Sequence, residues 1–144
     1  RVKEASVTIK ENVVSKIGNG FLILLGIENE DTQTDIDWLV GKIVKLRVFS
    51  DENEAMNLSI LDTQGDIIVV SQFTLHASTK KGNRPSFIKA ARPEVAIPLY
   101  KDFVLHLEKE LGKKVQTGTF GAMMDVSLIN DGPVTLVMDS KNKE

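Results

Sequence analysis

Apolar and polar residues alternate over the first part of the chain in the pattern of half-buried β-strands. Segments 5–9 (ASVTI) and 12–17 (NVVSKI) each alternate, and polar residues 10–12 between them suit a tight turn. We therefore predict a β-hairpin. Residues 18–20 (GNG) form a second turn signal, and the apolar segment 21–27 (FLILLGI) after them predicts a third strand.

Two later segments carry apolar residues at helical spacing. The first stripe is formed by Ile36, Leu39, Val40, Ile43 and Val44. Thr34, with Asp37 three residues further on, predicts a capping box at the start of this helix. A second helix is predicted over residues 93–111, with Gly112 as its C-terminal stop. The apolar face of that helix is formed by Leu99, Phe103, Leu107 and Leu111.

Further strands are predicted at residues 46–49 (LRVF), 66–75 (DIIVVSQFTL), 121–129 (GAMMDVSLI) and 134–139 (VTLVMD). The second of these begins with a continuous apolar run, which is typical of a strand buried on both faces. The acid-rich segment 50–54 (SDENE) predicts a loop. Because strands and helices are mixed without a repeat or a linker, we predict a single α/β or mixed α+β domain over residues 1–144.

Composition narrows the chemistry that this domain can perform. The absence of cysteine excludes disulfides, thiolate catalysis and cysteine-ligated zinc, and the two histidines are too few for a histidine-rich metal cluster. We expect no metal and no cofactor. The longest apolar run is far shorter than the ~20 residues of a membrane span, and no signal peptide is evident. These features favour a cytoplasmic protein.

Polar side chains and backbone N–H groups follow the predicted buried strand at residues 71–75 (SQFTL), which we call the first signature. A strand end at a sheet edge is a common place for a binding or catalytic site. The candidates here are Ser71, Gln72, Phe73 and Thr74. The alternative is an ordinary strand end whose polar side chains form local hydrogen bonds. No nucleophile-elbow pattern is present, so backbone chemistry is favoured over a hydrolase triad.

A basic segment follows at residues 80–93 (KKGNRPSFIKAARP) and contains no acidic residue. The whole chain has a net charge of −2, so Lys80, Lys81 and Arg84 form a local positive patch rather than part of a general positive field. Phe87 lies within it. Such a segment suits contact with RNA phosphates, whereas the alternative is a solvated loop.

Two further segments have both a functional and a structural interpretation. In residues 117–124 (TGTFGAMM), Phe120 and Met124 could form an apolar slot for an unpaired base, or simply pack in the core. In residues 130–135 (NDGPVT), the second signature, Asn, Asp and Gly would suffice for a turn. Pro133 additionally removes a backbone donor and permits a cis bond after Gly132 at modest cost. It therefore predicts either an ordinary loop or a rigid backbone feature that is presented to a ligand.

Taken together, SQFTL, KGNRPSF (residues 81–87), TGTFGAMM and NDGPVT resemble, in order and spacing, the D-aminoacyl-tRNA deacylase family. The likeness covers essentially the whole chain. It implies a strongly curved, barrel-like sheet of antiparallel and mixed strands with two main helices. It also implies a homodimer, with active sites at its interface, that hydrolyses the ester linking a D-amino acid or glycine to the 3′-terminal adenosine of tRNA and spares L-aminoacyl-tRNA. The family usually starts a few residues earlier, so we expect some native N-terminal residues to be missing.

The resemblance also suggests roles for individual residues. Gly132-Pro133, joined by a cis bond, would reach into the partner's pocket and exclude L side chains there. Gln72 and Thr74 would orient the substrate, and N–H groups around Phe73 would stabilise the oxyanion while the ribose 2′-hydroxyl assists. The other implied positions are Ser71 beside the substrate, Phe120 and Met124 at the adenine, Thr135 as a binding residue or less favoured nucleophile, and Arg1 near the Gly132-Pro133 loop.

Two alternatives remain open. One is a nucleic-acid-binding module without enzymatic activity, since related domains occur in a DNA-unwinding-element-binding protein. The other is a sister deacylase branch with relaxed chirality, whose signatures differ from SQFTL and NDGPVT.

Overall fold

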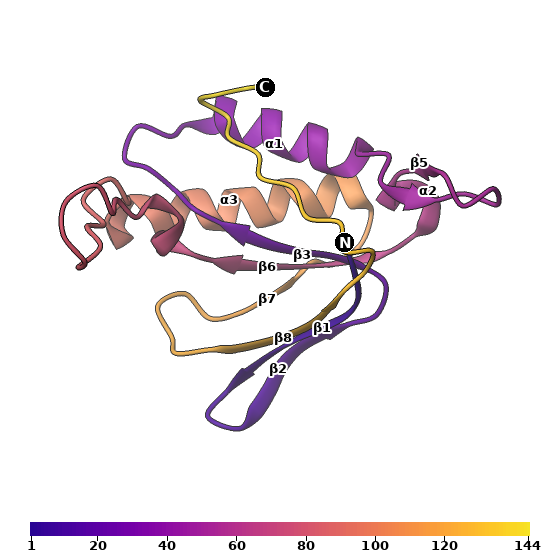
Figure 1. Cartoon of the computed structure of the whole chain (residues 1–144), viewed down its shortest axis with the longest axis horizontal. Helices are drawn as coiled ribbons and strands as arrows, with labels where there is room; N and C mark the ends of the chain where they lie inside the picture. The colour runs from indigo at the N-terminus through magenta and orange to yellow at the C-terminus, as the bar shows by residue number, and fades with distance from the viewer.

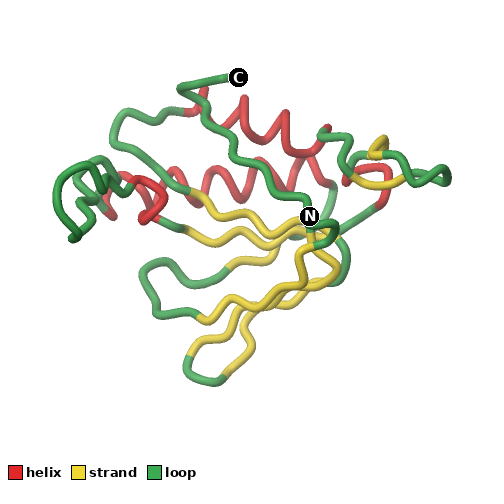
Figure 2. Tube along the Cα trace, viewed as in Figure 1, coloured by secondary structure: helices red, strands yellow, loops and turns green.

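A computed structural model describes residues 1–144, and Figures 1 and 2 show how its elements are arranged. The chain begins with strands β1 (Val2–Ile9), β2 (Asn12–Ile17) and β3 (Gly20–Leu25), followed by helix α1 (Gln33–Lys45). Next come β4 (Phe49–Ser50), β5 (Met56–Leu58), the one-turn helix α2 (Ile60–Thr63) and β6 (Asp66–Ser71). The chain continues through the 3-10 helix η1 (Phe73–His76), helix α3 (Pro93–Leu111), β7 (Gln116–Thr117) and β8 (Asp125–Asn130).

Six strands form one strongly curved sheet. Its order is β2-β1-β3-β6-β7, with β8 paired to β1, while β4 and β5 form a separate two-stranded ladder. The β1–β2 and β1–β8 pairs are antiparallel, and the β3–β6 and β6–β7 pairs are parallel. The sheet curls until Ser15 Oγ in β2 donates a hydrogen bond to the Thr117 carbonyl in β7. The predicted mixed α/β class and barrel-like sheet are confirmed.

Helices α1 and α3 pack against each other over one face of the sheet (Figure 1). A cluster of 17 buried apolar residues fills the space between the helices and the sheet. A second cluster, of six buried residues, lies on the inner side of the curl. Strand β6 contributes to both, because Ile67 and Val69 join the first cluster while Ile68 and Val70 join the second. The prediction that this strand is buried on both faces is confirmed.

The N-cap of helix α1 lies two residues before the predicted one. Thr32 is the N-cap, with extended backbone, and forms a capping box with Asp35 rather than the predicted Thr34–Asp37 pair. The Thr32 N–H donates to Asp35 Oδ2 at 2.8 Å. Asp37 instead lies on the helix surface, where Gln33 Nε2 donates to its Oδ1 at 2.9 Å. Helix α3 has the predicted bounds and ends at Gly112 in the left-handed conformation, with φ of 81°.

Several strand predictions are wrong in extent. Strand β6 stops at Ser71, although the Gln72 N–H still bonds to the carbonyl of Leu25, the last residue of β3, and η1 starts directly afterwards. Strand β8 starts at Asp125 because residues 119–122 form a turn. Of the predicted strand 46–49, only Phe49 belongs to β4.

The predicted strand 134–139 is not a strand. These residues belong to a segment, residues 134–141, that we call the C-terminal segment, and it runs as loop past β3 and α1 (Figure 2). Met138 packs against the core, whereas Val137 is 97% exposed. A loop whose alternate residues face the core produces the same apolar alternation as a strand, so the pattern alone did not separate them. No helix has the length and apolar character to cross a membrane.

Candidate active site

The first signature forms the end of β6 and the helix η1. Ser71 is the last residue of β6 and pairs in register with Leu25. Gln72 Nε2 donates a hydrogen bond to Thr74 Oγ1, so the two predicted orienting side chains are in contact. Phe73 and Thr74 are the first two residues of η1, where no acceptor exists within the helix, and their N–H groups have no other partner. Two adjacent backbone donors are therefore free.

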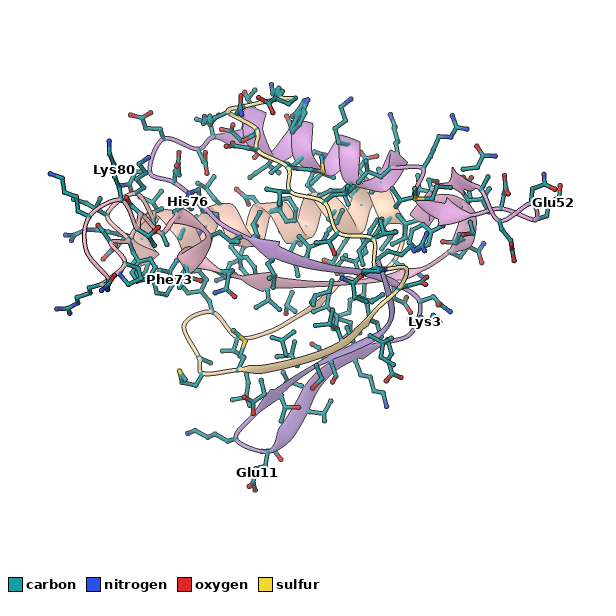
Figure 3. The ribbon with its side chains drawn as sticks, in the orientation of Figure 1. Lys3, Glu11, Glu52, Phe73, His76 and Lys80 are labelled. Carbon is teal, nitrogen blue, oxygen red and sulfur yellow. The ribbon has the colours of Figure 1, made fainter.

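The ring of Phe73 connects η1 to the basic segment. It is 55% exposed and contacts Phe87 edge to face, with ring centroids 5.1 Å apart. Lys80, Lys81 and Arg84 are exposed and form no ion pair. Figure 3 shows Phe73 and Lys80 at the same end of the molecule, opposite Glu52. The structure thus brings the first signature and the positive patch together.

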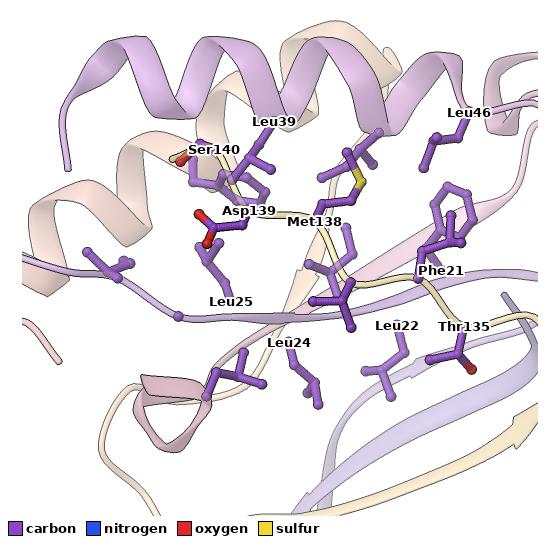
Figure 4. A pocket seen from close by; sticks show the side chains of 18 of the residues that line it. Phe21, Leu22, Leu24, Leu25, Leu39, Leu46, Thr135, Met138, Asp139 and Ser140 are labelled. Atoms are coloured by element: carbon purple, nitrogen blue, oxygen red, sulfur yellow. The ribbon is translucent and has the colours of Figure 1, made fainter. Parts of the chain in front are cut away.

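An apolar pocket of about 590 Å³ lies along β3, beneath α1 and beside the C-terminal segment (Figure 4). Phe21 and Leu25 point from β3 toward α1, and Leu22 and Leu24 point to the opposite side. Both ends of β3 contribute to its lining. Leu75 and His76 line it from η1, and the second signature contributes Asn130, Val134 and Thr135. The Thr135 hydroxyl accepts a hydrogen bond from Asn130 Nδ2 at 2.7 Å.

Phe120 and Met124 lie in the loop between β7 and β8, at the same end of the molecule as η1 (Figure 1). The Phe120 ring packs against the main core, with its centroid 6.0 Å from that of Tyr100. Met124 packs against the inner cluster. Burial raises the pKa of the Tyr100 phenol, whose hydroxyl donates to the Val69 carbonyl at 2.9 Å. Phe120 and Met124 are both half-buried, so each packs against a core cluster and still exposes part of its side chain.

The Gly132-Pro133 peptide bond is cis, and Arg1 holds the loop around it. Arg1 Nε lies 3.1 Å from Asp131 Oδ2, and the Asp131 N–H donates to the Arg1 carbonyl at 2.9 Å. Gly132 has φ of +117°, and a Cβ there would lie 2.9 Å from Val134 Cγ2. Only glycine fits this position without strain. The predicted closeness of Arg1 to this loop is confirmed.

Within one chain, the two signatures lie at opposite ends of β3. Gln72 is bonded to Leu25 at one end, whereas Val2 pairs with both Gly20 and Asn130 at the other. At ~3.3 Å per residue, the two ends of this strand are roughly 16 Å apart. Gly132-Pro133 therefore does not reach the η1 of its own chain.

Sequence reasoning missed one pair beside the first signature. His76 Nδ1, in the last residue of η1, lies 3.2 Å from Glu28 Oε1 in the loop after β3. The two residues are distant in sequence and belong to no motif, so only the fold brings them together. The structure contains no cluster of three or more acidic or histidine side chains that could hold a metal ion.

A model of the D-Tyr-tRNA(Tyr) deacylase family matches residues 1–139. The chain belongs to this family. The D-aminoacyl-tRNA deacylase of Flavobacterium johnsoniae is 67% identical over 144 residues, which cover all of this chain and 96% of that protein. The D-aminoacyl-tRNA deacylase of Parabacteroides distasonis is 61% identical with the same coverage. The resemblance drawn from the four sequence motifs, and with it the prediction of a D-aminoacyl-tRNA deacylase, is confirmed.

Two solved structures share the fold of this family member. The c-Myc DNA Unwinding Element Binding Protein is 45% identical and superposes with a TM-score of 0.86 over 94% of this chain and 92% of that chain. A probable eukaryotic D-amino acid tRNA deacylase superposes with a TM-score of 0.78 over 90% of each chain. At 16% identity, this second likeness concerns the fold alone.

Proposed function

We propose that the chain hydrolyses the ester bond between tRNA and a D-amino acid, or glycine, and releases free tRNA and the amino acid. It acts as a homodimer whose sites each combine η1 of one subunit with the Gly132-Pro133 loop of the other. The observation that carries this proposal is the separation of the two signatures along β3, since a single chain does not bring them together. Because its substrate is an aminoacyl-tRNA, we place the enzyme in the cytoplasm.

The surface around the second signature supports a second copy as the partner. Strand β8 pairs only with β1, so its other edge is open. Exposed apolar side chains on β8 and the C-terminal segment are Leu128, Ile129, Leu136 and Val137. Open strand edges and contiguous apolar surface are typical of protein interfaces. An interface here would carry Gly132-Pro133 toward the partner's first signature.

The free N–H groups of Phe73 and Thr74 support catalysis by backbone. An aminoacyl ester is already activated, so positioning and stabilisation of the developing oxyanion provide much of the rate. Gln72 and Thr74 orient the ester, Ser71 lies beside it, and the terminal ribose 2′-hydroxyl assists. No side chain then needs to act as nucleophile, and Thr135 contributes binding.

Chiral selection is assigned to the Gly132-Pro133 backbone. An apolar pocket distinguishes a methyl group only about 10- to 200-fold, which is too little to protect the large L-aminoacyl-tRNA pool. A rigid backbone can exclude an L side chain sterically while a hydrogen or a D side chain points elsewhere. The proline ring fixes φ, and Val134 and Arg1 leave no room for a side chain at position 132. Glycine is accepted because it has no side chain to exclude.

The remaining residues are assigned to the tRNA. Phe120 and Met124 line the site of the terminal adenine, where an aromatic and a thioether side chain suit an unpaired base. Lys80, Lys81 and Arg84 contact backbone phosphates beside η1. Phosphate contacts position a nucleic acid without selecting its sequence.

Incubation with D-tyrosyl-, glycyl- and L-tyrosyl-tRNA tests the proposal. We expect release of tRNA from the first two and protection of the third. Equal hydrolysis of the L-ester would instead indicate the branch with relaxed chirality. No hydrolysis of any substrate would refute the enzymatic proposal.

A second candidate function is binding of a nucleic acid without catalysis. The 45% identity to the c-Myc DNA Unwinding Element Binding Protein favours it, together with the unpaired basic side chains near Phe73. A gel-shift titration with duplex DNA and with uncharged tRNA separates the two functions. The deacylase proposal expects tRNA to bind more tightly than duplex DNA of equal length.

A further inference from the structure

The helix η1 is attached to the fold at both ends. At its start, the Gln72 N–H donates to the Leu25 carbonyl at 2.8 Å. At its end, His76 Nδ1 lies 3.2 Å from Glu28 Oε1. Figure 3 shows His76 and Phe73 at the same end of the molecule. Both attachments lead to β3 and the loop that continues it.

Glu28 is itself held firmly. Its N–H donates to Asp31 Oδ2 at 2.8 Å, and its carbonyl accepts from the Asp31 N–H at 3.2 Å. It also forms a bridge with Ala90 at the end of the basic segment. These contacts fix the backbone of Glu28, from which its carboxylate reaches Nδ1 of the His76 ring.

Gly26 shows how closely η1 packs on this loop. A Cβ added at Gly26 would lie 2.9 Å from His76 Nε2, 3.0 Å from its Cδ2 and 3.2 Å from Leu75 Cβ. The backbone of Gly26 is not in the left-handed region, so space and not backbone freedom explains the glycine. The absence of a side chain at position 26 leaves room for the Nε2–Cδ2 edge of the His76 ring, whose Nδ1 reaches Glu28.

We propose that the Glu28–His76 pair, seated on Gly26, is a positioning device that fixes η1 so that the Phe73 and Thr74 N–H groups point at the developing oxyanion. This inference rests on the proposed role of those two groups in deacylation. The pair does not touch the substrate. It acts through the backbone of η1, which is held by few hydrogen bonds. At the two ends of this helix, the Leu75 N–H donates to the Gln72 carbonyl and the Ala77 N–H donates to the Thr74 carbonyl.

The expected effect is on kcat and not on KM. Oxyanion donors act in the transition state, and tRNA affinity is assigned to other residues, so a displaced η1 slows the chemical step while substrate binding is preserved. Misplacement of catalytic groups by about 1 Å costs up to ~100-fold in rate. His76→Ala and Glu28→Ala should therefore each lower kcat for D-tyrosyl-tRNA by about 10- to 100-fold, and the double variant should be no slower than either single variant.

Three further variants separate positioning from general damage. His76→Asn keeps a donor near the position of Nδ1 and should restore most of the activity. Gly26→Ala in the otherwise wild-type chain should lower kcat. The loss in kcat should be smaller in the His76→Ala background, because the added methyl group no longer meets the imidazole ring. His106→Ala is the matched control: His106 Nδ1 lies 3.1 Å from Asp37 Oδ1 in a similar pair between α3 and α1, in which the histidine is half-buried and the aspartate is exposed. It should leave kcat unchanged.

A measurement without substrate completes the test. Amide hydrogen exchange at Leu75 and Ala77, whose N–H groups are hydrogen-bonded in η1, should accelerate in His76→Ala and Glu28→Ala and return toward the wild-type rate in His76→Asn. Unchanged kcat and exchange in these variants, with an active wild-type enzyme, would overturn this inference and leave the deacylase function intact. An inactive wild-type enzyme would refute the proposed function, whereas the exchange rates would still decide whether the pair holds η1. Additive losses in the double variant would show that the two residues act separately, and would also overturn the inference.

Discussion

Arg1 Nε lies 3.1 Å from Asp131 Oδ2, so the first residue of the chain is ion-paired to the loop that carries Gly132 and Pro133. Arg1 Nη1 also donates to the Val48 carbonyl at 2.5 Å, beyond the C-terminus of α1. The Arg1 side chain is only 9% exposed. One guanidinium therefore connects the second signature to the packed part of the domain.

Arg1→Ala should loosen the Gly132-Pro133 loop while the core stays folded. The change removes the charge-assisted hydrogen bond to the Val48 carbonyl and the ion pair with Asp131, and should lower the free energy of unfolding by about 2 kcal/mol. A mobile loop no longer excludes L side chains, so the ratio of D-tyrosyl- to L-tyrosyl-tRNA hydrolysis should fall about 10-fold or more. Both quantities are measurable by thermal unfolding and deacylation. Lys3→Ala, an exposed change on β1, is the control, and an unchanged ratio in Arg1→Ala would contradict the role of the pair.

Replacing Lys80, Lys81 and Arg84 together by alanine should weaken binding of every aminoacyl-tRNA alike. The slope of log affinity against log salt should decrease by roughly one unit at most for each lost phosphate contact. Fluorescence titrations at several salt concentrations measure this slope. The matched control removes Lys42, Lys45 and Lys109 from the last turns of α1 and α3, which lie at the other end of the molecule (Figure 1). Wild-type affinity and slope in the first variant would exclude the patch as a tRNA contact.

The pairing of Asp35 should make stability depend on pH in the acid range. Burial raises the pKa of Asp35, but the Thr32 N–H and the Lys141 ammonium, 3.0 Å away, outweigh burial and hold its pKa at about 2. Because the folded pKa lies below the unfolded value of ~3.9, the stabilisation is complete above pH ~4 and is lost as pH falls toward 2.

Asp35→Asn should remove this part of the pH dependence, on the order of 1–2 kcal/mol in the free energy of unfolding. Urea unfolding at several pH values between about 2 and 5 measures it. Asp102→Asn, an exposed change on α3, is the control. Parallel pH curves for wild type and Asp35→Asn would show that the ion pair does not contribute.

The sequence predicted the elements whose pattern follows from burial. The stripe of α3 and the two-faced burial of β6 are local consequences of the core, so periodicity located them. Periodicity did not locate the end of β6, because the change from strand to η1 depends on β3 ending at Leu25. It also placed the cap of α1 at Thr34, since both Thr32–Asp35 and Thr34–Asp37 have the capping-box spacing and only packing distinguishes them.

The motifs predicted which residues form the candidate site, but they did not predict how these residues are arranged in space. SQFTL and NDGPVT identified the family, but nothing in either motif shows that they lie at opposite ends of β3. The Glu28–His76 pair has no motif, because its residues meet only through the parallel pairing of β3 with β6. Contacts between distant segments are set by topology, and a single sequence does not contain that information in a local pattern.

Ser71→Ala and Thr135→Ala should both keep substantial deacylase activity. Removal of a true nucleophile costs several orders of magnitude in kcat, whereas removal of a binding hydroxyl costs much less. Thr135 Oγ1 is contacted by the Asn130 amide and by no base. Single-turnover deacylation of D-tyrosyl-tRNA measures the loss. A covalent aminoacyl-enzyme trapped on either residue would refute backbone catalysis.

Two inactive variants should restore activity to each other when their subunits are mixed. Phe73→Pro removes the Phe73 N–H at the first position of η1, where proline is tolerated in a helix. Gly132→Val places a side chain against Val134 and Arg1 at a φ of +117°. Each homodimer then has a defect in both sites and should be inactive. In a mixed dimer, one site receives both defects and the other receives neither, if each site is built from two subunits.

Random exchange of equal amounts gives mixed dimers as half of the population, with one intact site in each, so about a quarter of the wild-type activity should return. Native mass spectrometry establishes that mixed dimers have formed. The control mixture combines Phe73→Pro with a second η1 variant, Phe73→Pro/His76→Ala, which leaves every site defective and should stay inactive. Mixed dimers of Phe73→Pro and Gly132→Val without activity would place both signatures in sites of a single chain. Such a result would conflict with their separation along β3, and the proposed shared site would have to be abandoned.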